Sequence, residues 1–447
     1  MITAVTSARR RIRAALVVVS ATESIEDGVV EVTGNRITHV GSVPTAEPVD
    51  EEIDATEFLV IPAFVNTHAH TSQQLGRGLA DDVDLLTWLR DRIWPYDAAH
   101  PPADSEVSAL ACAAEQIRNG VTLLADPGGQ HVDAMAAGIA RSGIRAFVAA
   151  SAMDSGIGLP DGWAPSTDEM LARQEDLHSR LDGMAHGRVR FSWTLRTIFN
   201  CSDELIEATA HRARRADRPL QMHIAEVPEE NAHVQDTRGT TTVRHLSRLG
   251  VLGAGFLGAH AVWIDAEERR LLADSGAAVS HNVASNLRIL GFPHIADLVD
   301  VGCLVGLGTD GAPSNNRMSI LDEMWAASMV QKALRGDPAA FPSSTVLSMA
   351  TAWGARALGM GTELGTLRSG NLADLVLIDP LTPTMATAHD LVSALVTSCT
   401  SANVHSVMCD GSWVMRDREI TAFDEREVLR EAAARSRDVA RRIGLRP

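Results

Sequence analysis

Histidine and carboxylate residues follow directly after several short apolar runs of this 447-residue chain. The first run leads into His68-Ala-His70, whose alternate side chains point the same way in an extended segment and can bind one metal ion together. The fifth run leads into His223-Ile-Ala-Glu226, where the carboxylate can lie beside the ion as a proton shuttle. The eighth ends at Asp310, a further candidate ligand. These residue types predict a metal-assisted hydrolytic site, provided that the fold brings the strand ends together.

The segment from about residue 61 to 360 supplies the elements that must position these side chains. It alternates short apolar runs with longer amphipathic stretches, which is typical of repeated β/α units. The apolar runs end near Asn66, Asp126, Ala150, Trp193, His223, His260, His281 and Asp310. Eight runs are the number needed for a TIM-type (β/α)8 barrel, in which all C-terminal strand ends face one mouth. An open doubly wound sheet is the alternative, although no GxGxxG motif follows an early strand.

Amphipathic stretches between the runs predict the helices of these units. They cover Ser105 to Asn119, Asp203 to Arg215, Ala266 to Ser275 and Arg317 to Leu334.

Turn-rich segments flank this region on both sides. Between Gly28 and Val40 a Gly-Asn turn separates two β-rich runs, and strands with hairpin turns return after about residue 361. We predict that residues 1–60 and 361–424 pair into one small β-sandwich module beside a catalytic barrel of residues 61–360. An independent C-terminal domain is the alternative. Residues 425–447 are rich in Ala, Arg and Glu and predict a C-terminal surface helix, so the expected fold class is α/β.

The charge balance and the cysteines limit the partners and the location. With 57 acidic and 40 basic residues the net charge is -17, which repels phosphate backbones and anionic lipid, so neither nucleic acid nor a membrane is expected as a partner. Five scattered cysteines without a CxxC pair argue against a disulfide framework and favour a cytoplasmic location. No apolar stretch approaches the roughly 20 residues of a membrane span.

Together with His260 and His281, the strand-end motifs resemble those of the amidohydrolase superfamily, within its cytosine/adenosine deaminase-like branch. One strand-end histidine is more often structural, but their joint occurrence at barrel strand ends indicates a metal site. The matching motifs are Pro62-Ala-Phe-Val-Asn-Thr-His-Ala-His70, His223-x-x-Glu226, Ala259-His260, Ser280-His-Asn282 and Gly308-Thr-Asp-Gly-Ala-Pro-Ser-Asn-Asn316. The resemblance covers nearly the whole chain.

The resemblance implies one divalent metal ion per chain, zinc in the first place and iron as the alternative. The implied ligands are His68, His70, His223 and Asp310. The implied catalytic residues are Glu226, His260 and Asp310. Members of the superfamily with two metal ions bridge them by a carboxylated lysine after the fourth strand, whereas the single lysine of this chain, Lys332, follows the eighth. A mononuclear site of the deaminase type is therefore expected.

The implied chemistry is hydrolytic. A bound cation lowers the pKa of its water to about 7 and supplies hydroxide at neutral pH. Glu226 is expected to pass a proton to a ring nitrogen of the substrate, and His260 to stabilise the tetrahedral centre, while Asp310 holds the attacking water. Collapse of that centre then expels ammonia or another leaving group.

The segment from Arg77 to Pro95 resembles the methylthioadenosine/S-adenosylhomocysteine deaminases, and triazine hydrolases share much of the same frame. Three positions depart from the nucleoside deaminase pattern: Arg196 stands in place of a histidine, Ala149-Ala150-Ser151 follows the third strand where an arginine is expected, and Asp97 stands in place of a ribose-binding glutamate. Arg196 can bind a carboxylate or carbonyl in a bidentate manner, or form a salt bridge at the mouth. The expected substrate contacts are Trp94, Asp97, Arg196, His281 and Gln74.

The leading hypothesis is a hydrolytic deaminase of an amino-substituted N-heterocycle, either an adenosine-type nucleoside or a smaller purine, pterin, pyrimidine or triazine ring. An alternative keeps the site but expels chloride or an alkylamine, as triazine hydrolases do. A hypothesis of another class is a metal-containing binding protein without catalysis. The resemblance also implies a homodimer or a higher homo-oligomer.

Overall fold

Two parallel β-sheets occupy the middle of the molecule in the computed structural model, which describes residues 8–156 and 159–444. The first has the order β10-β9-β8-β6, with β6 (Phe64–Asn66), β8 (Val121–Ala125), β9 (Arg145–Val148) and β10 (Val189–Phe191). The second has the order β11-β12-β13-β14-β15, with β11 (Trp193–Leu195), β12 (Leu220–Ile224), β13 (Phe256–His260), β14 (Ala278–His281) and β15 (Leu304–Leu307). Almost all of their residues are buried, as expected for strands covered on both faces.

The two parallel sheets adjoin each other at both edges. At one edge the chain passes directly from β10 to β11 through Ser192, whose backbone N–H donates to Val148 O at 2.9 Å. At the other edge Thr67 N–H donates to Leu307 O at 2.8 Å, which links the residue after β6 to β15. The eight predicted runs are confirmed as strands. The fourth is split at Ser192, because β10 pairs with β9 and β11 pairs with β12.

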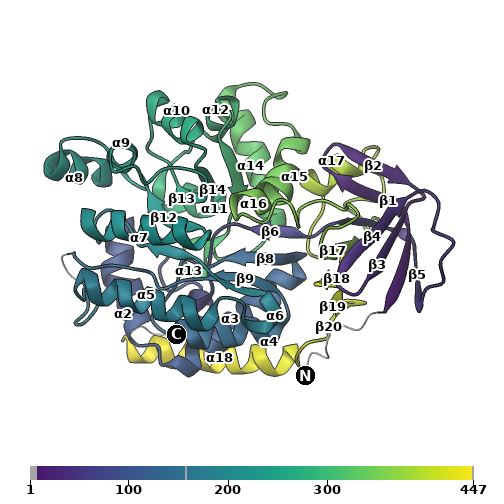
Figure 1. The fold of residues 1–447 in the computed structure, drawn as a ribbon, viewed down its shortest axis with the longest axis horizontal. Coiled ribbons are helices and arrows are strands. Elements are labelled where there is room, and N and C mark those ends of the chain that lie inside the picture. Colours follow the sequence, from purple (N-terminus) through teal and green to yellow (C-terminus); the bar gives the residue numbers. More distant parts are fainter. Residues whose placement is uncertain (1–7, 157–158, 445–447) are drawn as a thin grey trace.

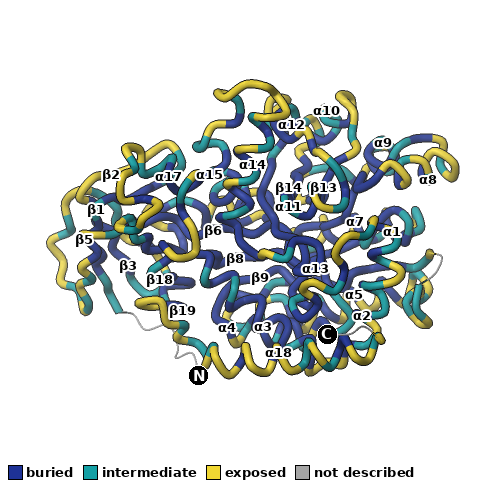
Figure 2. Tube along the Cα trace, turned by 180° about the vertical axis from the view of Figure 1, so that it is seen from behind, coloured by how far each residue is buried: buried dark blue, intermediate teal, exposed yellow. Residues whose placement is uncertain are grey.

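Helices lie between the parallel strands in the sequence and around them in space (Figure 1). The longer ones are α3 (Pro102–Arg118), α4 (Val132–Ser142), α5 (Thr167–Leu181), α7 (Asp203–Ala216), α8 (Pro228–Arg238), α9 (Thr242–Arg248), α10 (Ala266–Ser275), α12 (Ile295–Asp300), α14 (Ile320–Arg335), α15 (Ser343–Ala350) and α16 (Ala352–Ala357). All four helices predicted in this region are confirmed, with shifts of at most three residues at their ends. Their outer faces are exposed, whereas the strands between them are buried (Figure 2).

Short helices follow several strands on the side where the strands end. They are η1 (Thr71–Gly76), α1 (Leu85–Trp88), the π-helix η2 (Leu89–Ile93), α2 (Trp94–Ala98), α11 (Val283–Ser285), the π-helix η3 (Asn286–Leu290) and α13 (Ala312–Asn315). Two further helices lie elsewhere: α6 (Met184–Gly187) directly precedes β10, and α17 (Leu391–Thr397) lies between β17 and β18 in the sequence.

The N- and C-terminal segments share one nine-stranded sheet at one side of the molecule (Figure 1). Its strands are β1 (Arg9–Ser20), β2 (Glu23–Glu26), β3 (Val29–Thr33), β4 (Arg36–Gly41), β5 (Glu51–Pro62), β17 (Leu375–Ile378), β18 (Val404–Cys409), β19 (Ser412–Arg416) and β20 (Glu419–Ile420). The segments meet where β5 pairs antiparallel with β17, with Pro62 opposite Leu375. Gly34, at φ 60°, lies in the predicted turn between β3 and β4, a backbone conformation that glycine adopts without steric cost.

A buried ion cluster joins this sheet to the parallel strands. Arg145 of β9 donates to Asp374 at 3.1–3.3 Å and to Asp410 at 2.6 Å, and its side chain is 5% exposed. Arg188 lies 3.7 Å from the other oxygen of Asp410. Because each buried charge has a partner of opposite sign, the cluster fixes the two parts of the chain against each other.

Helix α18 (Glu425–Arg442) confirms the helix predicted after residue 425, while residues 445–447 lie outside the described part. It runs along one side of the parallel-strand region and packs on α3 (Figure 1). Arg435 and Arg442 both bind the buried carboxylate of Asp104 in α3, at 2.6 and 2.9 Å.

In the described ranges, no helix combines the length and the apolar character that crossing a bilayer requires.

Candidate metal-dependent active site

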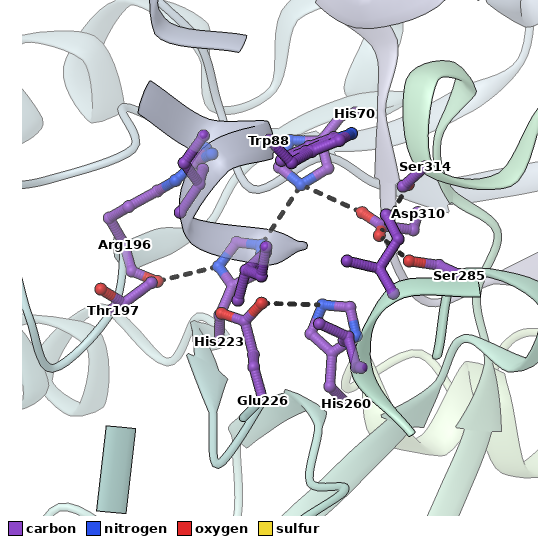
Figure 3. A pocket seen from close by; sticks show the side chains of 14 residues that line it. His70, Trp88, Arg196, Thr197, His223, Glu226, His260, Ser285, Asp310 and Ser314 are labelled. Atoms are coloured by element: carbon purple, nitrogen blue, oxygen red, sulfur yellow. Dashed lines mark hydrogen bonds and ion pairs between the residues drawn. The ribbon is translucent and has the colours of Figure 1, made fainter. Parts of the chain in front are cut away.

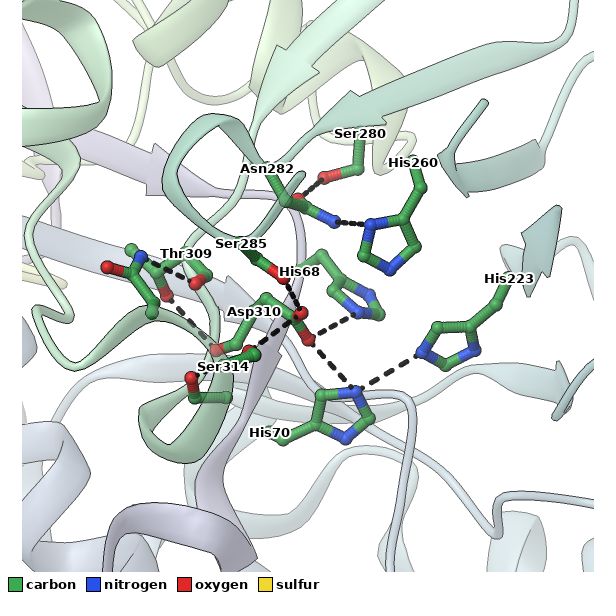
Figure 4. Close-up of polar contacts among 12 residues, drawn as sticks. His68, His70, His223, His260, Ser280, Asn282, Ser285, Thr309, Asp310 and Ser314 are labelled. Carbon is green, nitrogen blue, oxygen red and sulfur yellow. Dashed lines mark hydrogen bonds and ion pairs between the residues drawn. The ribbon is translucent and has the colours of Figure 1, made fainter. Parts of the chain in front are cut away.

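The first and eighth parallel strands bring His68, His70 and Asp310 together. Directly after them, β7 (Ala69–His70) pairs in parallel with β16 (Asp310–Gly311). The backbone N–H groups of Thr309 and Asp310 both donate to His68 O, at 3.0 and 2.9 Å. As a result, Asp310 Oδ1 lies 3.5 Å from His68 Nε2 and 3.4 Å from His70 Nε2 (Figure 4).

His223, at the end of β12, supplies a fourth group to this cluster. Its Nδ1 lies 2.8 Å from Arg196 O, and since a carbonyl oxygen only accepts, Nδ1 carries the proton. The lone pair of Nε2 therefore faces the cluster, 3.2 Å from His70 Nε2 (Figure 4). His68 Nε2 is buried and has no hydrogen-bond partner among the described residues. Two overlapping sets of side chains have potential ligand atoms within 4.8 Å of one another and could hold a metal ion: His68, His70 and Asp310, and His68, His223 and His260.

The protonation states favour metal binding at these four groups. Burial lowers the pKa of His68, and it lowers those of His70 and His223 further, so these imidazoles are neutral at neutral pH. Burial alone would raise the pKa of Asp310, but the adjacent histidines, His68 first, outweigh burial and lower that pKa. Neutral imidazole and ionised carboxylate are the forms that bind metal ions.

Glu226 and His260 lie next to His70, His223 and Asp310 (Figure 3). Glu226 Oε2 is 4.0 Å from His260 Nε2. Burial, and then the Asp310 carboxylate, raise the pKa of Glu226 to about 8, within the range useful for taking and giving a proton near neutral pH. His260 Nδ1 lies 2.8 Å from the amide oxygen of Asn286 and donates to it, which directs Nε2 toward Glu226.

The backbone around these residues adopts an uncommon conformation. Ala225, His260 and Asp310 have positive φ angles of 49°, 76° and 61°. Non-glycine residues adopt this region at an energetic cost that clusters at functional sites. The buried Glu230 of α8 stabilises one of these bends, since its carboxylate accepts from the N–H groups of Ala225 and Glu226 at 2.7 and 3.0 Å.

Two serines that the sequence analysis did not identify hold the second oxygen of Asp310. Ser285 Oγ and Ser314 Oγ donate to Asp310 Oδ2 at 2.5 and 2.9 Å, which leaves Oδ1 facing His68 and His70 (Figures 3 and 4). A signal was present in the sequence, because each serine begins a Ser-Asn pair shortly after a strand.

A narrow pocket opens over this cluster. Its apolar wall comes from Leu85, Trp88, Leu89, Ile289 and Leu290, and its volume is about 30 Å³, enough for one or two water molecules. The indole Nε1 of Trp88 is buried without a hydrogen-bond partner among the described residues.

Two of the predicted substrate contacts lie at or near the pocket. Arg196 lines it, and its guanidinium makes only a 3.4 Å hydrogen bond to Ser151 Oγ among the described residues. Asp97 is half-buried, and burial raises the pKa of its carboxyl to about 7 although the charge of Arg196 opposes the shift.

The other three predicted contacts do not line the pocket. Trp94 lies in α2 outside the lining residues. Gln74 donates to Glu115 at 2.6 Å, and the adjacent Gln73 is buried. His281 is fully buried, with Nδ1 3.4 Å from Asn286 Nδ2. Of the five predicted substrate contacts, Arg196 is thus the one that lines the pocket.

The chain belongs to the amidohydrolase family, whose family model matches residues 59–414. The 5-methylthioadenosine/S-adenosylhomocysteine deaminase of Pelotomaculum thermopropionicum is 34% identical over 414 residues, which cover 92% of this chain and 93% of that protein. The 5'-deoxyadenosine deaminase of Methanothermobacter thermautotrophicus is 36% identical over 416 residues, which cover 92% of this chain and 95% of that protein.

Solved structures with the same fold include two zinc-containing enzymes. An adenosine deaminase from Xanthomonas campestris with bound zinc superposes with a TM-score of 0.90 at 29% identity, covering 97% of this chain and 98% of that one. Atrazine chlorohydrolase from Arthrobacter aurescens complexed with zinc gives a TM-score of 0.88 at 25% identity, covering 96% of this chain and all of that one.

Proposed function

We propose that this protein is a metal-dependent hydrolytic deaminase that releases ammonia from an amino-substituted N-heterocycle, with a 5'-modified adenosine such as methylthioadenosine or S-adenosylhomocysteine as the first candidate substrate. The observation that carries the proposal is that His68, His70 and Asp310 could hold one metal ion, with His223 Nε2 3.2 Å from His70 Nε2, beside a buried, protonatable Glu226. The names of two curated relatives, at 34% and 36% identity, support the same reaction and substrate class.

One zinc ion per chain, with iron as the alternative, is held by His68, His70, His223 and Asp310 in this proposal. The unpartnered Nε2 of His68 and the inward-facing Nε2 of His223 fit such an ion. When bound, it supplies a water molecule of lowered pKa at neutral pH.

The chain's own residues then move the protons and hold the substrate's reacting atoms. Glu226 accepts a proton and delivers it to the ring nitrogen of the heterocycle, since its raised pKa allows both steps near neutral pH. His260 Nε2 faces the same space and donates to oxygen at the tetrahedral centre once protonated. Ser285 and Ser314 keep Asp310 oriented during these steps.

Substrate binding requires the pocket to open. Its volume of about 30 Å³ is too small for a nucleoside, so the apolar wall that carries Trp88 must shift to admit one. The π-helix η2 directly follows Trp88, and π-helical turns often occur at functional sites. Arg196 and Asp97 are the polar groups that the proposal assigns to the substrate; it makes no use of Trp94, Gln74 or His281.

Two other functions remain as alternatives with defined outcomes. The likeness to atrazine chlorohydrolase supports a hydrolase that expels chloride or an alkylamine from a triazine. The other alternative is a metal-containing binding protein without catalysis. It requires that the protein converts none of the candidate substrates, although Glu226 and His260 lie beside the candidate metal ligands.

Architecture and assembly form a second part of the proposal. We propose that the two adjoining sheets close a (β/α)8 barrel of residues 61–360, and that the nine-stranded sheet of residues 1–60 and 361–424 folds into a sandwich around a core that includes Ile12, Val60 and Leu375.

The buried free cysteines support a cytoplasmic location. Exposed apolar side chains on α14, Trp325 and Met329, support a homo-oligomer, which light scattering tests.

Product analysis tests the reaction. Zinc-loaded protein is incubated with methylthioadenosine, S-adenosylhomocysteine, adenosine, guanine, a pterin, cytosine and an aminochlorotriazine, and ammonia, chloride and alkylamine are measured. Ammonia from the adenosine compounds is expected. Chloride or alkylamine release alone would identify the triazine-hydrolase alternative, and no release from a protein with one metal ion per chain would favour the binding protein.

A further inference from the structure

A cavity of about 620 Å³ lies at the end of the molecule where the parallel strands begin, away from the candidate active site. Leu220 and Phe256, the first residues of β12 and β13, line it, whereas His223 and His260 lie near the other ends of the same strands. The rest of the wall comes from the end of α7, the connections before β12 and β13, and the end of α16. This volume is typical of small-molecule sites, and no residue of the metal cluster lines it.

Positive charge is concentrated in this cavity although the chain has a net charge of -17. Four arginines line it, against one carboxylate, that of Asp217. The arginines are Arg190, Arg214, Arg218 and Arg356.

These arginines are incompletely paired. Arg218 has a carboxylate partner, Asp182, at 2.8 Å. Arg214 donates to the carbonyl oxygen of Gly250 at 3.2 Å and has no ion pair with any described residue. Arg356 is exposed, and its guanidinium forms neither a hydrogen bond nor an ion pair within residues 8–156 and 159–444. These last two guanidinium groups are therefore available to a ligand.

Arg190 lies deeper and is also poorly neutralised. Its closest carboxylate, Glu363, is 3.7 Å away, and Nη1 faces the thioether sulfur of Met360, a weak acceptor, at 2.8 Å. Burial lowers the pKa of Arg190, Glu363 opposes this shift, and the charges of Arg218 and Arg145 add to it. An anion bound here would offset the mutual repulsion of these groups.

Apolar side chains form the remaining wall, so the cavity combines a cationic part with a surface for a ring. Leu220, Phe256 and Leu358 are all buried and line it. Guanidinium groups bind phosphate oxygens in a planar, bidentate arrangement. We propose that this cavity binds a phosphorylated small molecule, with its phosphate at Arg190, Arg214 and Arg356 and its apolar ring against Phe256.

Calorimetric titration of the full-length, metal-loaded protein with phenyl phosphate tests the proposal. One saturable site per chain is expected. The double variant Arg214→Ala/Arg356→Ala should bind at least about tenfold more weakly, since it loses charge-assisted hydrogen bonds. Arg215→Ala is the matched control, because Arg215 is an exposed neighbour on α7 outside the cavity lining, and its affinity should equal that of the wild type.

The opposite results would overturn the proposal. Absence of saturable binding, or equal affinity of the wild type and the double variant, would show that these arginines do not form a phosphate site. Inorganic phosphate is expected to bind more weakly than phenyl phosphate, and equal affinities would contradict the role given to Phe256. A thermal melt of each variant establishes that it is folded. None of these outcomes depends on the deaminase reaction.

Discussion

Replacing Glu226 by glutamine removes one proton-transfer group while leaving its surroundings in place. Glutamine has the same length, so the backbone contacts of Glu230 with residues 225 and 226 remain. The four candidate metal ligands do not include Glu226, and metal content should therefore stay at the wild-type level. The amide can neither accept nor release the proton that the reaction moves.

The expected loss follows from this role. Positioned general acid–base catalysis contributes roughly 10²- to 10⁴-fold in rate, so kcat should fall by that factor, equivalent to about 3–5 kcal/mol in the activation free energy. The larger end of the range is expected here, because Glu226 is buried and water cannot readily replace it. KM should change little, since the proposal gives Glu226 no part in holding the ground state.

Steady-state ammonia release from methylthioadenosine, with metal analysis of the same sample, measures both effects. Glu229→Gln is the matched control, since Glu229 is exposed three residues further along the chain and should retain wild-type kinetics. Activity of the Glu226→Gln protein within a factor of ten of the wild type would refute the proton-transfer role. Loss of metal in that variant would show instead that Glu226 helps to hold the ion.

Three further changes test the fold around the site. Arg145→Met leaves Asp374 buried without its partner and should lower the unfolding free energy by about 3–5 kcal/mol in chemical denaturation. Gly308→Ala would place a Cβ 2.9 Å from His68 Cβ and should lower metal content, measured by elemental analysis. Burial raises the pKa of Glu31, but its hydrogen bonds, from Thr45 first and then from the arginines, outweigh burial and lower that pKa to about 2. The ionised carboxylate therefore stabilises the fold above about pH 4.5, and this stabilisation is lost as the pH falls toward 2. Glu31→Gln should accordingly lower the unfolding free energy by less at pH 3 than at pH 7, which denaturant melts measure.

The strands and helices were predictable because their signals are local. Apolar runs mark strands, and the helical period marks α7 and α10, whose bounds the sequence nearly reproduces. Histidines at strand ends indicate the cluster because parallel β/α folds bring those ends to one mouth.

Side-chain direction near the site was not predictable in the same way. Gln73 and Gln74 are adjacent in η1, and the tight turn of a 3-10 helix directs one into the interior and the other toward Glu115. Ser285 and Ser314 approach Asp310 only through the packing of two connections that are distant in sequence. The pairing of β5 with β17 also depends on tertiary contact, although turn patterns at both ends of the chain suggested it.

The most direct test of the central claim is ammonia release from methylthioadenosine before metal removal, after removal by a chelator, and after zinc is restored, with metal content determined on each sample. We expect activity with about one ion per chain, its loss in the stripped protein, and its return with zinc. Unchanged ammonia release by metal-free protein, or none from protein with a full complement of zinc, would contradict the assignment of a metal-dependent deaminase.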